Sequence, residues 1–391
     1  MSLKPIHPFP ARMAPEIALA EIAGLPRDAI ILDPMCGSGT VLRLSAETGR
    51  RSIGCDLDPL AVLLSSAWTS GVEPHTVVPA AEAAVRCAST VSLDESDLAW
   101  RFDPEMSAFV GYWFAPEQAE SLARLGTVLC RERSACGDVL RVCLSRLVIT
   151  KERGASLARD VSHSRPHKVR DTNRFDVMSE FLRSAAVVAS RLSAAPVLQR
   201  AEVRLADARA LSHLADGSFD AVITSPPYLN AIDYMRGHKF ALIWLGHTLS
   251  ELRQIRASAV GSETGPCANH ELAPILDQVK ELRWYAKLLP RQAGMVRRYA
   301  SDIHGLMREI GRVLKDQGRA VLVVGNSCIR GVYVENSQVI QIAASEVGLR
   351  CDSAYVRDLP SSLRYLPLSA KSPNNLARRM RKECVLSFAK N

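Results

Sequence analysis

Long hydrophobic runs are missing from this sequence. It contains no stretch of eighteen consecutive apolar residues, so no membrane-spanning helix is predicted. Residues 1–15 contain several prolines and no apolar segment, which argues against a secretory signal peptide. These two absences place the expected protein in the cytoplasm.

A cysteine framework is also missing, although ten cysteines are present. None of them forms a C-x-x-C pair. The densest group, Cys130, Cys136 and Cys143, is too widely spaced for a zinc knuckle. No metal site is therefore predicted. Scattered cysteines without a pairing pattern are typical of a chain that folds in a reducing compartment.

Neither internal repeats nor low-complexity tracts are found. The chain is 47% hydrophobic and 23% charged, values typical of globular proteins that exclude disordered, collagen-like and coiled-coil classes. Its 391 residues fit one domain with a large insertion, or two domains. The net charge of +8 permits a polyanionic partner without establishing one.

The hydrophobic pattern predicts alternating strands and helices at both ends of the chain. Short apolar runs, each followed by a turn or a helical pattern, are found at Ala29–Leu32, Arg51–Cys55, Val203–Leu205, Phe219–Thr224 and Arg319–Val324. Arg350–Arg357 and Glu383–Phe388 are expected to be a closing pair of strands. Between residues 72 and 200 this alternation is lost and helical patterns dominate. We therefore expect a doubly wound α/β domain, formed by 1–71 and 201–391, that is interrupted by a mostly helical insertion.

Two polar features follow the first two predicted strands. Gly37 and Gly39 lie in a turn that leads into a helix, where backbone can approach a ligand closely. Asp56 ends the second strand, where a carboxylate can accept hydrogen bonds from two ribose hydroxyls. Because Leu42 replaces a third glycine and no G-x-x-x-x-G-K-[ST] motif is present, a dinucleotide and a nucleotide-triphosphate site are disfavoured. The pattern indicates a nucleoside-containing cofactor, although an ordinary tight turn has the same glycines.

The strand at 219–224 runs directly into Ser225-Pro226-Pro227-Tyr228. Two prolines remove two N–H donors and fix the backbone, which leaves rigid carbonyl acceptors for a planar amino group. The Ser225 hydroxyl adds an acceptor, and Tyr228 offers a flat face on which a base can stack. Taken alone, a proline-stiffened loop with a surface tyrosine explains this segment equally well.

Together these motifs resemble the S-adenosylmethionine-dependent DNA amino-methyltransferases, and within them the N4-cytosine type. The resemblance rests on Asp33-Pro34-Met35-Cys36-Gly37-Ser38-Gly39-Thr40, Asp56, Leu205-Ala206-Asp207-Ala208-Arg209, Ser225-Pro226-Pro227-Tyr228 and His7-Pro8-Phe9-Pro10-Ala11-Arg12. It covers roughly two thirds of the chain. It implies a Rossmann-like fold with a mostly parallel sheet and an antiparallel closing strand, and S-adenosylmethionine as the cofactor.

The resemblance also implies roles for single residues. Phe9 and Thr40 border the methionine part of the cofactor, while Asp33, Pro34, Gly37 and Gly39 form its turn. Asp56 binds the ribose and Asp207 the adenine. Ser225 and the Pro226 carbonyl accept hydrogen bonds from the target amine, Pro227 stiffens the loop, and Tyr228 stacks on a flipped-out base. Serine at position 225 points to cytosine N4, whereas Asp or Asn there is usual for adenine.

Two groups of basic residues are candidates for contact with DNA. Arg165, Lys168 and Arg170 lie in a basic stretch at 151–174 that either follows the phosphate backbone or is a solvated loop. Arg236, His238 and Lys239 lie just after the Pro-Pro motif and either bind a phosphate or begin a solvated helix face. The target-recognition region can lie before or after the Pro-Pro motif, and both places hold enough chain: the insertion at 72–200, which is the candidate region, and Gly246–Tyr299.

The expected function is transfer of a methyl group to cytosine N4 in double-stranded DNA, by a nucleoid-associated protein. A separate restriction endonuclease is the expected partner if the enzyme belongs to a restriction–modification pair. Three alternatives stay open: an N6-adenine DNA enzyme, an RNA base amino-methyltransferase, and a non-catalytic nucleic-acid-binding module with the same fold.

Overall fold

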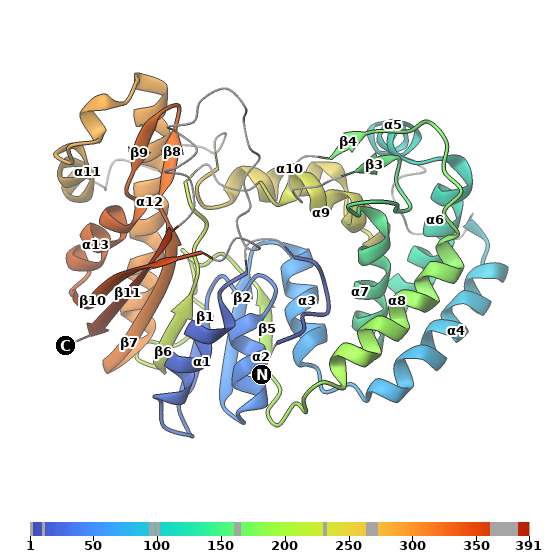
Figure 1. Ribbon diagram of the computed structural model, residues 1–391, viewed down its shortest axis with the longest axis horizontal. Helices are drawn as coiled ribbons and strands as arrows, with labels where there is room; N and C mark the ends of the chain where they lie inside the picture. Colours follow the sequence, from blue (N-terminus) through green and yellow to red (C-terminus); the bar gives the residue numbers. More distant parts are fainter. Residues whose placement is uncertain are drawn as a thin grey trace.

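A seven-stranded sheet organises the computed structural model, which describes residues 3–9, 12–93, 98, 102–159, 166–229, 233–262, 273–359 and 382–390 (Figure 1). The strand order is β10–β11–β7–β6–β1–β2–β5. The strands are β1 (Ile30–Asp33), β2 (Arg51–Asp56), β5 (Glu202–Leu205), β6 (Phe219–Thr224), β7 (Leu314–Gly325), β10 (Leu349–Asp358) and β11 (Lys382–Lys390).

The central strands β5, β2, β1, β6 and β7 pair in parallel, whereas β11 is antiparallel to both β7 and β10. The α/β class, the mostly parallel sheet and the antiparallel closing strand are thus confirmed. Because β1 lies between β6 and β2, the chain reverses its winding direction beside β1. Open α/β sheets bind ligands at such a point, outside the carboxyl ends of the strands.

Side chains of the central strands alternate between two buried layers. On β1, Ile31 packs in one layer and Leu32 in the other, and on β6, Ile223 and Val222 divide in the same way. Alternation follows from the two-residue period of a strand, and burial on both faces explains the nearly continuous apolar runs in the sequence.

Helices cover both faces of the sheet (Figure 1). One layer contains α1 (Pro15–Ala23) and α2 (Thr40–Glu47). The other contains α11 (Ala273–Lys280), α12 (Pro290–Val313) and α13 (Asn336–Glu346), with the short helix η4 (Tyr285–Lys287) and the hairpin of β8 (Ser327–Ile329) and β9 (Val332–Val334) nearby. α3 (Pro59–Thr69) follows β2 and contacts both β2 and β5.

A helical unit lies beside the sheet, on the right of Figure 1. It is formed by α4 (Pro74–Thr90), α5 (Pro104–Trp113), α6 (Pro116–Arg131), α7 (Ala135–Val148) and α8 (Val177–Leu192), with the two-residue strands β3 (Ala158–Arg159) and β4 (His167–Lys168). Six of the described helices, including α4, α5 and α6, begin at a proline, a residue favoured at the first helical position because its missing N–H has no partner there.

The segment that follows the Pro-Pro motif packs with this helical unit. It comprises α9 (Met235–Leu242), the short helix η3 (Ile243–Leu245) and α10 (Leu249–Ser258). Phe240, Trp244 and Leu252 are buried in the same apolar cluster as residues of α3, α4, α6, α7 and α8. The helical unit therefore draws on two separate parts of the chain.

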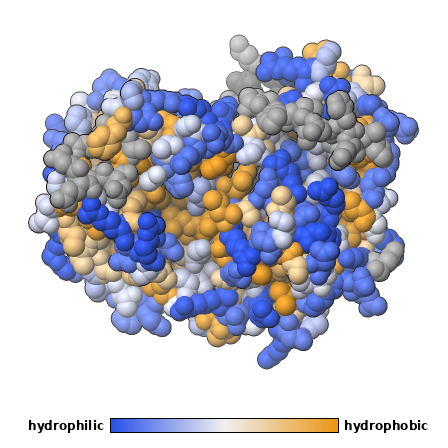
Figure 2. Space-filling model, turned by 180° about the vertical axis from the view of Figure 1, so that it is seen from behind, coloured by the Kyte–Doolittle hydropathy of each residue, from blue (hydrophilic) through white to orange (hydrophobic). Residues whose placement is uncertain are grey.

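The segment at 72–200 leaves and rejoins the sheet domain at neighbouring points. A Cβ atom on Gly71 would lie 3.2 Å from Nε of Arg200, and the backbone N–H of Leu198 donates to the carbonyl of Ala46 at 2.9 Å. In the opposite view, apolar residues gather in the middle of the surface with polar residues around them (Figure 2).

Within the described part of the chain, no helix combines the length and apolar character needed to cross a bilayer.

Candidate cofactor and target-base site

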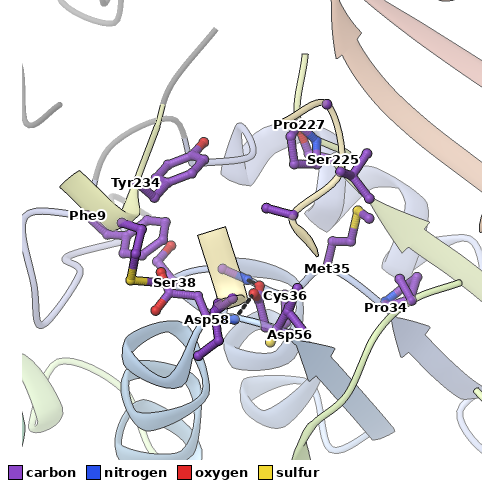
Figure 3. Close-up of a pocket in the computed structure, with 18 of the residues that line it drawn as sticks. Phe9, Pro34, Met35, Cys36, Ser38, Asp56, Asp58, Ser225, Pro227 and Tyr234 are labelled. Atoms are coloured by element: carbon purple, nitrogen blue, oxygen red, sulfur yellow. Dashed lines mark hydrogen bonds between the residues drawn. The ribbon is translucent and has the colours of Figure 1, made fainter. Parts of the chain in front are cut away.

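The predicted motifs meet at one cavity. It has a volume of about 260 Å³ and lies at the carboxyl ends of β1, β2 and β6. Figure 3 shows Asp56, Asp58 and Cys36 on one side of it, Ser225 and Pro227 on another, and Phe9 beside Tyr234 on a third. Of the residues predicted for the site, those that line the cavity are Phe9, Asp33, Pro34, Gly37, Thr40, Asp56, Asp207, Ser225, Pro227, Tyr228 and Arg236.

Gly37 and Gly39, in the turn after β1, are each favoured for a different structural reason. Gly37 has φ +51° and its N–H donates to Oδ2 of Asp56 at 2.8 Å, which fixes the turn against the end of β2. Gly39 has φ +81°, and a Cβ there would lie 2.8 Å from Oγ of Ser65 on α3. Gly39 is not among the lining residues. Close packing of this turn on α3 is therefore one reason for a glycine here, and its approach to a ligand stays a prediction.

Asp56 presents a carboxylate to the cavity. Oδ2 accepts from the N–H of Gly37 and Oδ1 accepts from the N–H of Asp58 at 2.9 Å. Burial, followed by the neighbouring charge of Asp58, raises the pKa of Asp56 to about 6. Each oxygen uses one backbone donor, so both keep acceptor capacity for further hydroxyl groups.

Asp33 ties β1 to β6 beneath the cavity. Its Oδ1 accepts from Oγ1 of Thr224 at 2.7 Å and from the N–H of Met35 at 3.3 Å. The side chain is 3% exposed, and burial raises its pKa to about 7. This carboxyl therefore sets the spacing between the glycine turn and the Pro-Pro motif.

The Ser-Pro-Pro-Tyr segment leaves β6 with its serine fixed. Oγ of Ser225 donates to the carbonyl of Val323 at 2.9 Å, and the Tyr228 hydroxyl is a second partner of this side chain. With its proton committed, the serine oxygen can act toward a ligand only as an acceptor. Ser225, Pro227 and Tyr228 line the cavity, whereas Pro226 is buried and is not a lining residue. Burial raises the pKa of the Tyr228 hydroxyl far above its usual range, so the ring stays neutral.

Three residues that sequence reasoning missed support this segment from β7, β8 and α13. A Cβ on Gly325 would lie 2.9 Å from Cε2 of Tyr228, so the tyrosine ring rests on bare backbone. Oγ of Ser327 donates to the carbonyl of Leu229 at 2.5 Å. Nδ2 of Asn336, which is fully buried, donates to the carbonyl of Gly325 at 2.9 Å and to Ser327 Oγ at 2.8 Å. The strand predicted at 319–324 ends just before Gly325 and Ser327, but Tyr228 and Leu229, which these two residues contact, lie far away in the chain.

An aromatic group closes the side of the cavity near the N-terminal segment. The ring of Phe9 stacks on Tyr234 with centroids 5.6 Å apart and lies 5.0 Å from the ring of His238. Nδ1 of His238 lies 2.5 Å from Oδ2 of Asp58, and the histidine is 7% exposed. This burial directs His238 to Asp58 and disfavours the predicted phosphate contact.

Asp207 lines the cavity, and so does the segment 258–262. Burial acts to raise its pKa, but the Arg209 guanidinium outweighs burial and lowers it. Arg209 donates to both Asp207 oxygens, to the carbonyl of Ser258 at 2.6 Å, and to Asp302. Arg209 thereby joins the chain after β5 to α10 and α12.

The remaining basic candidates are distributed around the helical unit. Nζ of Lys239 lies 5.1 Å from the centre of the Phe109 ring, and Nζ of Lys168 lies 4.9 Å from that of Tyr112. Lys168 also pairs with Asp171 at 3.0 Å, and Arg170 donates to the carbonyl of Glu152 at 3.1 Å. Arg165, Pro10 and Ala11 lie outside the described residues.

Comparisons with known sequences agree in naming methyltransferases. Residues 7–62 match the family model described as UPF0020, an RMKL-like methyltransferase domain. The Type II methyltransferase M.BsoBI of Geobacillus stearothermophilus is 47% identical over 47 residues, which are 12% of this chain and 9% of that relative. The Type II methyltransferase M.AvaI of Anabaena variabilis is 26% identical over 178 residues, 40% of this chain and 37% of the relative. In each case the match spans less than two thirds of the relative.

Solved structures give weak overall likeness. An S-adenosylmethionine-dependent methyltransferase from Methanosarcina mazei is 11% identical with a TM-score of 0.34, covering 97% of this chain and 99% of that one. A putative DNA modification methylase from Thermus thermophilus, solved with S-adenosylmethionine, is 17% identical with a TM-score of 0.24, covering 47% of this chain and 51% of that one. The match to a methyltransferase family model agrees with S-adenosylmethionine as the predicted cofactor.

Proposed function

We propose that this chain is an S-adenosylmethionine-dependent DNA methyltransferase that methylates the N4 amine of a flipped-out cytosine. The observation that carries the proposal is the meeting of the glycine turn, Asp56 and Ser225 on one cavity. The matches to Type II methyltransferases support DNA as the substrate. Ser225, where a carboxylate or amide would favour adenine, supports cytosine.

The residues around the cavity fit S-adenosylmethionine by their chemistry. Asp56 has unused acceptor capacity on both oxygens for two ribose hydroxyls. Asp207 lines the same cavity and accepts from Arg209, and it would accept a further hydrogen bond from the adenine amine. Phe9 and Thr40 also line the cavity and would border the methionine part. When bound, the cofactor supplies an electrophilic methyl group.

The Pro-Pro motif would hold the target base in line with that methyl group. Oγ of Ser225 accepts a hydrogen bond from the cytosine amine because its own proton is committed to the Val323 carbonyl. Tyr228, fixed on Gly325, supplies the stacking surface. Fixed acceptors around the amine favour a pyramidal nitrogen, whose lone pair is less conjugated with the ring and attacks more readily.

We further propose that different segments of the chain carry out catalysis and target recognition. Residues 1–71 and 201–391 would form the catalytic domain and 72–200 the recognition region, with α9 and α10 contributing to the latter. A separate restriction endonuclease would be the partner if this protein serves a restriction–modification pair.

The test is to express the protein in a methylation-free host and to sequence the genomic DNA by a method that reports modified bases. We expect N4-methylcytosine at one short motif, and its loss in Tyr228→Ala. Tyr355→Ala is the matched control, because Tyr355 is exposed on β10. N6-methyladenine would overturn the cytosine assignment. Purified protein that fails to bind S-adenosylhomocysteine in calorimetry would overturn the enzyme assignment itself.

A further inference from the structure

Two arginines from different helices meet at the cavity. Arg236 on α9 and Arg256 on α10 both line it, and Asp233 lies between them. Oδ2 of Asp233 is 2.8 Å from Nε of Arg236 and 2.6 Å from Nε of Arg256. Because both guanidinium groups contact the same oxygen, they lie side by side. Sequence reasoning had identified Arg236 but neither Asp233 nor Arg256.

The three charges do not cancel. Two guanidinium groups and one carboxylate carry a net charge of +1. The side chains of Arg236 and Arg256 are 43% and 40% exposed, so the excess charge is accessible from the cavity mouth. Burial lowers the pKa of Lys239, and the charge of Arg256 lowers it further, which indicates that Lys239 shares this positive environment.

The guanidinium groups also have donors to spare. Among the described residues, neither side chain donates a hydrogen bond through a nitrogen other than Nε. A guanidinium offers five N–H donors in a planar fork that matches the oxygens of a phosphate. The terminal N–H groups of the two guanidinium groups, which are not bonded to Asp233, are therefore suited to bind an oxyanion with one negative charge.

The fold does not depend on this group for stability. α9 and α10 are held by the buried side chains of Phe240, Leu249 and Leu252. Partly exposed ion pairs contribute little to folding free energy, typically about 0–1 kcal/mol. A carboxylate that gathers two arginines at a cavity mouth is better explained by the anion that they would bind.

We propose that Arg236 and Arg256, held together by Asp233, bind a backbone phosphodiester of the nucleotide whose base enters the cavity. The inference rests on the proposed function, because it takes DNA as the substrate. Arg236 and Arg256 are binding residues, and Asp233 is a positioning residue. His238, whose Nδ1 lies beside Asp58, is not part of this proposed site.

The experiment measures binding of a fluorescent duplex oligonucleotide by anisotropy at several salt concentrations. We expect Arg236→Gln and Arg256→Gln to lower the slope of log K against log salt by about one each. Asp233→Asn should act in the opposite direction. It leaves the positive charge in excess, so duplex binding is retained or tightened, while methyl transfer falls because the two arginines are no longer held together.

The matched control is Arg350→Gln, since Arg350 on β10 is also paired with an acid, Asp352, and is 66% exposed. An unchanged salt slope in both cavity variants, or a loss of slope in the control of the same size, would overturn the inference. Calorimetric binding of S-adenosylhomocysteine separates this result from the proposed function. If the wild-type protein binds S-adenosylhomocysteine but Arg236→Gln and Arg256→Gln leave the salt slope of DNA binding unchanged, only the phosphate site is rejected. The proposed function then stands.

Discussion

At the scale of the residue, the two carboxyls Asp33 and Asp56 that line the cavity differ in their hydrogen bonding. Asp56 is half-buried and each of its oxygens accepts one backbone N–H, whereas Asp33 is buried and its Oδ1 accepts from both Thr224 and Met35. The pKa of Asp33 is raised by burial to about 7 from 3.8. A raised pKa means that the folded protein favours the protonated carboxyl, so stability is lost as pH rises through about 7.

We therefore expect Asp33→Asn to raise stability at pH 8 relative to the wild type, by roughly 1–3 kcal/mol. The amide keeps an acceptor oxygen for Thr224 and carries no charge. The difference should shrink as pH falls to 5, and thermal unfolding across this range measures it. Asp220→Asn is the control of opposite sign, because Asp220 bonds to Lys315 and to the N–H of Ile30, and its pKa is lowered. A Tm difference at position 33 that does not vary with pH would contradict this account.

Gly325 gives a second prediction at this scale. A methyl group there would displace the ring of Tyr228 toward the cavity. Under the proposed function, in which the Tyr228 ring stacks on the target base, we expect Gly325→Ala to lower kcat for methyl transfer by about tenfold or more, because a small misplacement of such a group is costly. Binding of S-adenosylhomocysteine should be unchanged. Gly294→Ala is the control, since the nearest atom to a Cβ there is 3.9 Å away. Equal kcat in the two variants would show that Tyr228 is free to move aside.

At the scale of the element, α6 and η3 approach very closely. A Cβ on Gly126 of α6 would lie 2.4 Å from the carbonyl oxygen of Trp244 in η3. This contact joins the helical unit to the segment that leaves the Pro-Pro motif. The backbone of that segment is therefore positioned by a helix from a distant part of the chain.

We expect Gly126→Ala to destabilise the protein by about 1–3 kcal/mol, because neither backbone can yield without displacing its helix. Gly111→Ala is the matched control: it is helical, and nothing lies within 4 Å of the added Cβ. Helix propensity alone predicts that Gly111→Ala raises the free energy of unfolding by up to about 1 kcal/mol. Urea unfolding of both variants measures the contrast, and similar midpoints would count against the close approach of α6 and η3.

At the scale of the whole molecule, the helical unit and the sheet domain share α3. Leu60, Leu64 and Trp68 of α3 are buried in the cluster of the helical unit, while Ser65 contacts the glycine turn of the sheet domain. A shared helix couples the two parts. We expect one calorimetric unfolding transition, whose midpoint rises with S-adenosylhomocysteine concentration. Two separate transitions, with only one shifted by the nucleoside, would show that the parts unfold independently.

Sequence patterns predicted the features that depend on residues close together in the chain. The strands β1, β2 and β6 and the motifs that follow them depend on neighbouring residues, and their meeting at one edge follows from parallel pairing. Contacts across long sequence distances escaped prediction. The role of Gly39 is set by Ser65, the direction of His238 by Asp58, and the support of Tyr228 by Gly325. None of these pairs leaves a periodic signal, because each arises when separate elements pack together.

The two ends of the segment 72–200 meet beside Arg200, which has a consequence for exchanging this segment between proteins. Because its two ends are neighbours, the segment could be expected to be exchangeable as one piece between proteins with the same sheet domain. Phe240 and Trp244 come from outside it, however, and fill its interior. A chimaera that exchanges residues 72–200 alone would expose these two aromatic side chains. A functional graft has to carry residues 235–258 as a second piece, and with them Arg236 and Arg256.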